Sequence, residues 1–372
     1  MTKLNSIAII DPVGAKAGMD WYGIQLLRAF NRTGWQTRFL SNSNMTDDQV
    51  SVLNVFNNQE DRGLKSLLKI LKGLFSARKI LQQEKNQVVI LHIFRSDWLE
   101  LLFSFVFYKA GFTVCLIIHD IESLDTWKNA MSRKWILKRF HHYKIVHNSF
   151  SEQELKKIIT GKDAANLHVI PHGDFTGMIE EFKPDVNDIH LNPFDRSKIN
   201  LLFFGQIKKV KGLDILLQAM HHIEDGLKLT VAGKERDDSI AGYKALIDDL
   251  KKKGGIEIIN RHISDSERDY LFKNCDAVIL PYRHIYQSGV LLMAMSYGKT
   301  VIASDLPAFK EIIIHESNGF LFQNGNIKSL ASVLTQLKYT ANAEIGKAAK
   351  TFVHEHYNWN KIAGLYVRMF NN

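Results

Sequence analysis

Short apolar runs alternate with longer stretches of helical periodicity along most of this chain of 372 residues. The runs of the first half are Ser6–Ile10, Gln36–Leu40, Val88–Ile93, Thr113–Ile118, Tyr143–His147 and His168–Ile170. A second alternating series extends from Asn200 to about Leu337. Such alternation is typical of parallel sheets with helices on both faces, so the sequence predicts an α/β, doubly wound fold.

The chain is too long for one ordinary hydrophobic core and suits two domains. Between the two alternating series, an acidic stretch with Pro and Asn extends from Asp174 to Lys198 and shows no regular period. We therefore predict an N-terminal domain over residues 1–178, a linker over 179–198 and a C-terminal domain over 199–356.

The segment Cys275–Ser304 places a helix start soon after a buried strand. Its apolar run Ala277–Leu280 is followed by a loop ending in Gln287–Gly289, and a helical pattern starts at Val290. Backbone N–H groups at such a helix start suit a phosphate. The alternative is that Ser288 only caps the helix.

A second segment has a glycine turn and a basic loop after its strand, Leu201–Phe204. In open α/β sheets ligands bind at this carboxyl end, where lysines and bare amides suit a diphosphate. The alternative is a solvated charged face. The residues concerned are Gly205, Gln206, Lys208, Lys209, Lys211 and Gly212.

Together these segments resemble the nucleotide-binding half of GT-B glycosyltransferases, specifically family 4 and its relatives. The family pattern G-R-L-x-x-x-K-G falls on Gly205–Gly212, and A-M-A-x-G-x-P-V-I-A-S falls on Ala294–Ser304. Shorter matches in the family's order are Val169–Gly173, Leu229–Gly233, Leu280–Tyr282, Asn318–Phe322 and Tyr357–Trp359. The resemblance implies two Rossmann-like domains facing a cleft. It also implies a C-terminal helix, about 357–372, that crosses back to the N-terminal domain.

Two departures from the family pattern affect the site. Gln206 replaces the family's phosphate-binding arginine, so positive charge must come from Lys208 or Lys209 as well as Lys211. Ile285 and Met293 occupy the positions of the two glutamates of retaining members. A Q-S-G loop of this kind resembles a subset of exopolysaccharide-building enzymes, and the ribose contact and stereochemical course stay open.

The resemblance implies a glycosyltransferase of the EC 2.4 class that uses a nucleotide-diphosphate sugar donor. The implied acceptor is a saccharide linked to a lipid such as polyprenyl diphosphate, in bacterial surface or exopolysaccharide biosynthesis. Lysines and helix-start amides can stabilise the leaving diphosphate without metal, and no suitable Asp-x-Asp loop is present. We therefore expect no cofactor and no metal, and we add Arg261 to the donor-binding residues.

In the N-terminal domain, candidate residues follow predicted strands. Gly18 belongs to a glycine-spaced loop that we expect to face the cleft, near the donor phosphates or the acceptor, and we count it among the donor-binding residues. Asp20 behind it serves as a base or caps the next helix. His119 follows the end of a strand, and the resemblance implies that it lies beside the transferred sugar. The alternative is a polar residue that only forms hydrogen bonds at the strand end. Asp120 is a candidate general base if the enzyme inverts. His172 either reaches the cleft or belongs to a structural turn.

The formal net charge of +9 is distributed unevenly. Gly63–Lys85 carries apolar and lysine stripes, and Trp127–Lys144 is basic and aromatic. Stripes of this kind suit an anionic membrane surface, the alternative being apolar faces packed on the sheet. No nucleic-acid motif is present. Cys115 and Cys275 lie in apolar runs and, together with the absence of a signal peptide, predict a cytoplasmic protein. The two basic segments predict that it is peripheral on the membrane.

Two other functions fit the same architecture. A catalytically silent GT-B-like partner subunit would explain the missing glutamates. A nucleotide-sugar epimerase would convert the donor without any acceptor. The spacing of these motifs does not identify the donor sugar, the nucleotide base, the linkage formed or the oligomeric state.

Overall fold

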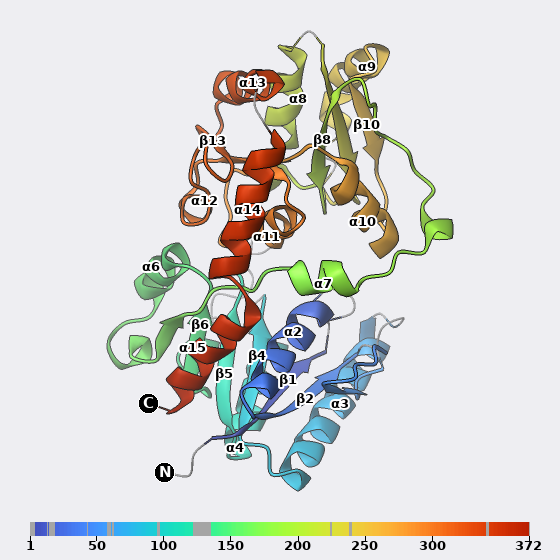
Figure 1. Ribbon diagram of the computed structural model, residues 1–372. Coiled ribbons are helices and arrows are strands. Elements are labelled where there is room, and N and C mark those ends of the chain that lie inside the picture. The colour runs from blue at the N-terminus through green and yellow to red at the C-terminus, as the bar shows by residue number, and fades with distance from the viewer. Residues whose placement is uncertain are drawn as a thin grey trace. The chain divides into compact units, whose positions relative to one another are not determined.

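The computed structural model describes residues 4–12, 14, 19–42, 44–57, 61, 63–94, 97–121, 135–223, 225–237, 240–339 and 342–371. The chain divides into two compact units (Figure 1). Unit 1 comprises Met1–Gly173 with Tyr357–Asn372, and unit 2 comprises Asp174–His356. Unit 2 therefore starts before the predicted linker and includes it.

Unit 1 is built on a seven-stranded sheet in the order β3-β2-β1-β4-β5-β6-β7, with parallel pairing throughout. β1 and β4 are buried along their whole length, as expected for strands covered on both faces. The strand order reverses between them, which is where open α/β sheets bind ligands. The strands are β1 Ser6–Asp11, β2 Gln36–Ser41, β3 Ser51–Asn54, β4 Val88–Ile93, β5 Thr113–Ile118, β6 Tyr143–Val146 and β7 Leu167–Val169.

The helices of unit 1 cover both faces of this sheet. α2 and the last helix, α15, pack side by side over one face (Figure 1), so the C-terminal helix returns to the N-terminal unit as expected. α4 packs on β4 and β5, and α3 packs against α4. The helices are α2 Asp20–Arg32, α3 Gly63–Gln83, α4 Trp98–Lys109, α6 Ser149–Ile158 and α15 Trp359–Asn371, with the 3₁₀ helix η2 Gly161–Ala164.

Unit 2 has a six-stranded parallel sheet in the order β10-β9-β8-β11-β12-β13. Its strands are β8 Ile199–Phe204, β9 Leu227–Ala232, β10 Ile256–Ile259, β11 Ala277–Leu280, β12 Thr300–Ser304 and β13 Phe320–Phe322. Its helices are α7 Thr176–Glu181, α8 Leu213–His221, α9 Lys244–Lys252, α10 Asp265–Asn274, α11 Gly289–Ser296, α12 Pro307–Lys310, α13 Ile327–Gln336 and α14 Asn342–His356. Its described residues also form the 3₁₀ turns η3 Val186–Asp188, η4 Lys209–Lys211, η5 Ala241–Tyr243 and η6 Leu337–Tyr339.

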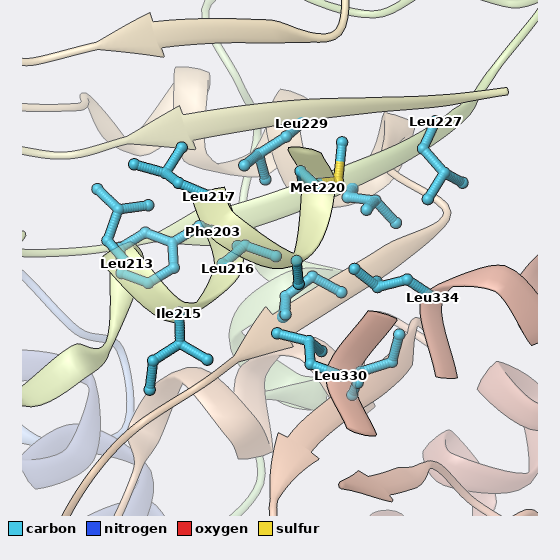
Figure 2. Close-up of a cluster of buried hydrophobic side chains, with 14 of the residues drawn as sticks. Phe203, Leu213, Ile215, Leu216, Leu217, Met220, Leu227, Leu229, Leu330 and Leu334 are labelled. Carbon is cyan, nitrogen blue, oxygen red and sulfur yellow. The ribbon is translucent and has the colours of Figure 1, made fainter. Parts of the chain in front are cut away.

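The core of unit 2 fixes the start of α8. Figure 2 shows Leu213, Leu216 and Leu217 of α8 packed among side chains from the sheet and α13. All three leucines are almost fully buried. Each such side chain contributes about 1.5–3 kcal/mol by leaving water. This packing holds α8, and with it the loop 205–212, at the carboxyl end of β8.

The two sheets confirm the predicted α/β fold, and most strands lie within a residue or two of their predicted bounds. β3 was not predicted, because four residues with no fully buried side chain give little periodic signal. Part of the basic segment Trp127–Lys144 falls on residues 127–134, outside the described residues.

Candidate functional site

The loop after β8 brings a lysine and a helix start together in unit 2. Gly205 has φ +97°, and a Cβ on it would lie 2.9 Å from Lys211 Nζ and 3.9 Å from Val290 Cγ2. The bare glycine therefore lies between the Lys211 ammonium and the first turn of α11. Two segments distant in sequence meet here, at the carboxyl ends of the neighbouring strands β8 and β11.

Gly212 lets this loop approach the chain after β11. Its φ is +66°, and a Cβ would collide with the carbonyl oxygen of Pro281. Two hydrogen bonds from Arg283 strengthen the same contact: its backbone N–H donates to Val210 O at 2.8 Å, and Nη1 donates to Lys209 O at 2.8 Å. The lysine loop is thus fixed to the strand end through its own backbone carbonyls, which accept from the backbone and the side chain of Arg283.

Lys211 is a cation held in an unusual environment. Burial, and then the charge of Lys208, lower its pKa to about 8. Its Nζ lies 5.5 Å from the centroid of the Tyr282 ring, within cation–π range. Among the described residues no carboxylate lies within ion-pair distance of Lys211. An anion bound here would therefore favour the charged form of the lysine.

The start of α11 is capped by Ser288, whose hydroxyl accepts a hydrogen bond from Leu291 N at 3.2 Å. The capping role considered from the sequence is therefore present. The Ser288 hydroxyl binds the N–H of the third helical residue, Leu291. The N–H groups of Gly289 and Val290 belong to the same first turn. Capping and anion binding by the same turn are compatible.

The other predicted donor-binding residues lie in different surroundings. Gln206 is exposed and Gln287 is half-buried. The guanidinium of Arg261 pairs with the Glu267 carboxylate through N···O distances of 2.6 and 2.7 Å. β9 separates β10, which leads to Arg261, from β8. The structure therefore brings Gly205, Lys211 and Val290 together, and it pairs Arg261 with Glu267.

Four imidazoles gather at the carboxyl ends of consecutive strands in unit 1. They come from the β4, β5, β6 and β7 strand ends and surround the buried Tyr22 of α2, with ring centroids 4.8–6.0 Å from the tyrosine ring. The phenol also contacts the Trp359 ring of α15 at 5.0 Å. The four are His92, His119, His147 and His172.

His119 is held on two sides. His92 Nδ1 lies 2.9 Å from His119 Nε2, and the Phe94 ring stacks on the His119 ring at 4.5 Å with an interplanar angle of 7°. Burial lowers the pKa of His92 to about 3. His92 is therefore neutral near pH 7, and the two rings share a hydrogen bond in which one ring nitrogen donates and the other accepts.

Two further members of the cluster are kept neutral in the same way. Burial lowers the pKa of His147 to about 4 and that of His172 to about 3. Their Nδ1 atoms lie 2.9 Å from Ile170 O and 2.6 Å from Gly173 O. His92 and His147 were not among the site residues predicted from the sequence. Their position at the ends of neighbouring predicted strands was the available signal.

Two carboxylates converge near the end of β1. A Cβ on Gly14 would meet Asp20 Oδ1 and lie 2.7 Å from Asp11 Oδ2. Asp20 is the first residue of α2 while Met19 occupies the N-cap, so Asp20 is a first-turn acid rather than the cap. Asp120 directly follows His119 and is half-buried. Gly18 lies outside the described residues.

An apolar cavity of about 290 Å³ adjoins this part of unit 1. Apolar side chains of β1, β4 and α4 form most of its wall, together with Asp11, His92 and Glu100. Among the described residues no group of three or more histidine, cysteine, aspartate or glutamate side chains is arranged to hold a metal ion.

Comparisons with known proteins agree with this architecture. Residues 198–338 match the family model described as glycosyl transferases group 1. An uncharacterized glycosyltransferase of Methanocaldococcus jannaschii is 24% identical over 72% of this chain and 71% of its own length. A GDP-mannose:cellobiosyl-diphosphopolyprenol alpha-mannosyltransferase of Xanthomonas campestris is 25% identical over 45% of this chain. That match spans less than half of the mannosyltransferase, 45% of its length.

Among solved structures, the sucrose-phosphate synthase of Thermosynechococcus elongatus superposes with a TM-score of 0.76. The two chains are 18% identical, and the superposition covers 98% of this chain and 99% of the synthase. At that identity the likeness establishes the fold alone. Residues 198–338 thus match the glycosyltransferase group 1 family, and the chain has the GT-B fold of two Rossmann-like units.

Proposed function

We propose that this protein transfers a sugar from a nucleotide-diphosphate donor to an acceptor hydroxyl, and that Lys211 binds the donor diphosphate. The observation that carries the proposal is the meeting of Lys211 Nζ, the bare Gly205 and the first turn of α11. A cation and helix-start amides at one strand edge form a diphosphate seat. Lys208 adds positive charge, since it lowers the pKa of Lys211.

The seat supplies the main chemical requirement of the reaction. As the glycosidic bond to the donor phosphate breaks, negative charge grows on the bridging oxygen. A fixed ammonium and fixed N–H groups stabilise that charge without having to reorganise. We expect turnover to persist in the presence of EDTA, because these groups carry the charge themselves.

We assign His119 to the transferred sugar, by its resemblance and by its rigid setting between His92 and Phe94. Asp20 and Asp120 are the candidate general bases if the anomeric configuration inverts, since the acceptor hydroxyl must then lose its proton to a carboxylate.

We infer a lipid-linked saccharide acceptor of bacterial surface polysaccharide assembly. The Xanthomonas relative carries such an acceptor, a diphosphopolyprenol, in its name. The apolar cavity beside Asp11 and His92 is suited to an acceptor that combines apolar and polar groups.

A lipid-linked acceptor requires access to a membrane, and α3 offers a surface for it. The helix has two apolar stripes. Ile70, Leu74, Ala77 and Leu81 are buried, whereas the stripe of Leu64, Leu67, Leu68 and Phe75 is exposed, Leu64 to 72% and Phe75 to 55%. The sequence alone could not separate a packed stripe from a free one.

Lysines border the exposed stripe of α3. Lys65, Lys72 and Lys79 recur at seven-residue spacing, which places them on one side of the helix. Lys65 pairs with Asp61 at 3.0 Å, whereas Lys72 and Lys79 form no ion pair with the described residues. Exposed leucines beside lysines suit an interfacial helix on anionic lipid. Across the described residues, no helix has the length and hydropathy to cross a bilayer.

The membrane assignment is tested by sedimentation with vesicles that contain phosphatidylglycerol. Leu64→Gln with Leu68→Gln should lower the bound fraction several-fold, because it removes the exposed apolar area. Val186→Gln, at a residue of unit 2 that is 76% exposed, is the matched control and should bind like the wild type. Equal binding by all three proteins would exclude the α3 surface.

The transfer reaction is tested by product analysis with a panel of UDP, GDP and ADP sugars, with and without an acceptor. Lys211→Met should lower kcat/KM by about 10²–10³-fold while the protein stays folded, because it removes charge stabilisation at the leaving group. Lys347→Met, at an exposed lysine of α14, should not change it. Full turnover by Lys211→Met would refute the assignment, and conversion of the donor without acceptor would indicate an epimerase.

A further inference from the structure

A basic pocket lies at the amino-terminal edge of the unit 1 sheet, the edge opposite to the histidine cluster. Its volume is about 340 Å³, at the lower end of ordinary small-molecule sites. Its walls come from the end of α4, the turn 138–142 before β6, Lys144 of β6 and the segment 162–166 before β7. The proposed donor and acceptor residues are not part of it.

The pocket carries an excess of positive charge. Lys138, Arg139, Lys144 and Lys162 line it, against a single carboxylate, Asp163. Asp163 pairs with Lys138 at 3.5 Å. The two histidines of the wall do not offset this charge: burial lowers the pKa of His141 to about 4 and lowers that of His142 too.

Lys144 is the central cation, and it is buried, with 3% of its surface exposed. Its Nζ lies 2.9 Å from His141 Nε2, and His141 Nδ1 lies 2.7 Å from Arg139 O. Because a carbonyl only accepts, His141 Nδ1 carries the hydrogen and Nε2 accepts from the ammonium. The imidazole thus uses one of the three N–H groups of Lys144.

No carboxylate of the described residues lies within ion-pair distance of the Lys144 ammonium. Burial lowers its pKa, and the more distant Asp163 opposes this effect. A buried ammonium without a paired anion destabilises the fold, whereas a neutral side chain of similar shape would not. The presence of a lysine at this buried position, in spite of the destabilisation, points to a bound anion.

The turn that carries Arg139 is held in place before any ligand binds. Phe140 has φ +62°, a conformation that costs a non-glycine residue free energy. Ser104 Oγ donates to Phe140 O at 2.5 Å, and the Phe140 ring packs edge-on against Phe105 at 5.0 Å. The Arg139 guanidinium lies 4.8 Å from the Trp135 ring centroid.

We propose that this pocket is a second anion site, which binds a phosphoryl group through Lys144, Arg139, Lys138 and Lys162. The neutral His141 accepts from Lys144 and so aims the remaining ammonium hydrogens at the ligand. The phosphoryl group belongs either to free phosphate or to the headgroup of an anionic phospholipid, since both offer the same oxygens.

The test measures the binding of inorganic phosphate by calorimetry at constant ionic strength. It uses Lys211→Met as the parent, so that the proposed donor seat does not contribute. Adding Lys144→Met should weaken phosphate binding by about tenfold or more, because it removes a charge-assisted hydrogen bond. Arg139→Gln, on the exposed rim, should weaken it less, and Lys347→Met should not change it.

A stability measurement separates ligand binding from a structural role of Lys144. In phosphate-free buffer Lys144→Met should keep or raise the Tm, because it replaces a buried charge by an apolar chain of similar length. A lower Tm there would assign the lysine to the fold and overturn the proposal. Phosphate binding that is unchanged by both Lys144→Met and Arg139→Gln would overturn it as well.

Vesicles distinguish the two sources of the phosphoryl group. If phosphatidylglycerol vesicles bind the parent and lose affinity with Lys144→Met, the ligand is a lipid headgroup. If only inorganic phosphate shows the dependence on Lys144, the ligand is a free phosphate. Both outcomes support an anion site, and neither depends on Lys211 being the donor seat.

Discussion

The two units use the same edge of the same kind of sheet for opposite chemistry. In unit 2 the loops after β8 and β11 collect a cation, a bare glycine and a helix start. In unit 1 the ends of β4 to β7 collect imidazoles that burial keeps neutral. One edge is built to stabilise negative charge, and the other to donate and accept hydrogen bonds in fixed directions. Parallel sheets position residues, and the residue types decide the chemistry.

The largest expected difference between the units is in acid stability. The buried histidines have pKa values of about 3–4 in the folded protein, against about 6.5 when unfolded. Between these values the unfolded chain binds more protons, so unit 1 loses stability as the pH falls below 6.5. The slope is about 1.4 kcal/mol per pH unit for each histidine.

Unit 2 provides the internal control for this prediction. None of its histidines is buried. Its paired acids, such as Glu267, whose pKa Arg261 holds below the usual range, lose their contribution only below about pH 4.5. Limited proteolysis between pH 7 and 5, read by mass spectrometry, should release unit 1 peptides first. Simultaneous cleavage of both units would contradict the contrast.

The next effect concerns the backbone contact that positions the lysine loop. Gly212→Ala should destabilise unit 2 by about 2–4 kcal/mol, because the methyl group meets Pro281 O and φ is positive. Gly242→Ala is a matched control, since a Cβ there meets nothing within 4 Å and φ is not positive. Thermal unfolding should leave this control unchanged or slightly more stable. Equal Tm values for both variants would show that the loop relaxes freely.

A smaller effect should follow from removing the partner of His119. His92 Nε2 is buried without a hydrogen-bond partner among the described residues. An unpaired acceptor nitrogen is more readily tolerated than an unpaired N–H, so His92 Nδ1 carries the hydrogen and donates to His119 Nε2. His119 therefore has its own hydrogen on Nδ1, and His92 acts as a positioning residue.

Nitrogen NMR of labelled histidines measures that tautomer directly. The wild type should show His119 protonated on Nδ1, and His92→Leu should lose this preference and lower kcat by about tenfold with little change in KM. His92→Asn restores an N–H donor near the same place and should recover part of the rate. A wild-type His119 protonated on Nε2 would contradict the assignment.

The two regions also differ in how far they could be predicted from the sequence. Gly205, Lys211 and Ser288 lie in contiguous strand–loop–helix segments, where a glycine turn and nearby lysines carry the signal. His92 and His147 are single residues at strand ends, and only the strand order β4-β5-β6-β7 brings them to His119. That order depends on tertiary packing, which local periodicity does not report.

Side-chain partners were the least predictable part. From the sequence, Arg261 was predicted to bind the donor. In the structure its guanidinium pairs with the carboxylate of Glu267, the third residue of α10. Similarly, the two apolar stripes of α3 look alike in sequence, and only the structure shows which one is buried. Which group a side chain pairs with or packs against depends on the tertiary structure, and the local sequence does not report it.

The most direct test of the diphosphate seat is the pH dependence of nucleoside diphosphate affinity. The pKa of Lys211 is about 8 in the free protein, and a bound diphosphate must raise it. Calorimetry with the tightest of UDP, GDP and ADP, carried out from pH 7.5 upward, should therefore give an affinity that falls by up to about tenfold per pH unit above pH 8. Lys211→Arg, which stays charged, should remove this dependence. A wild-type affinity that is flat up to pH 9.5 would contradict the account.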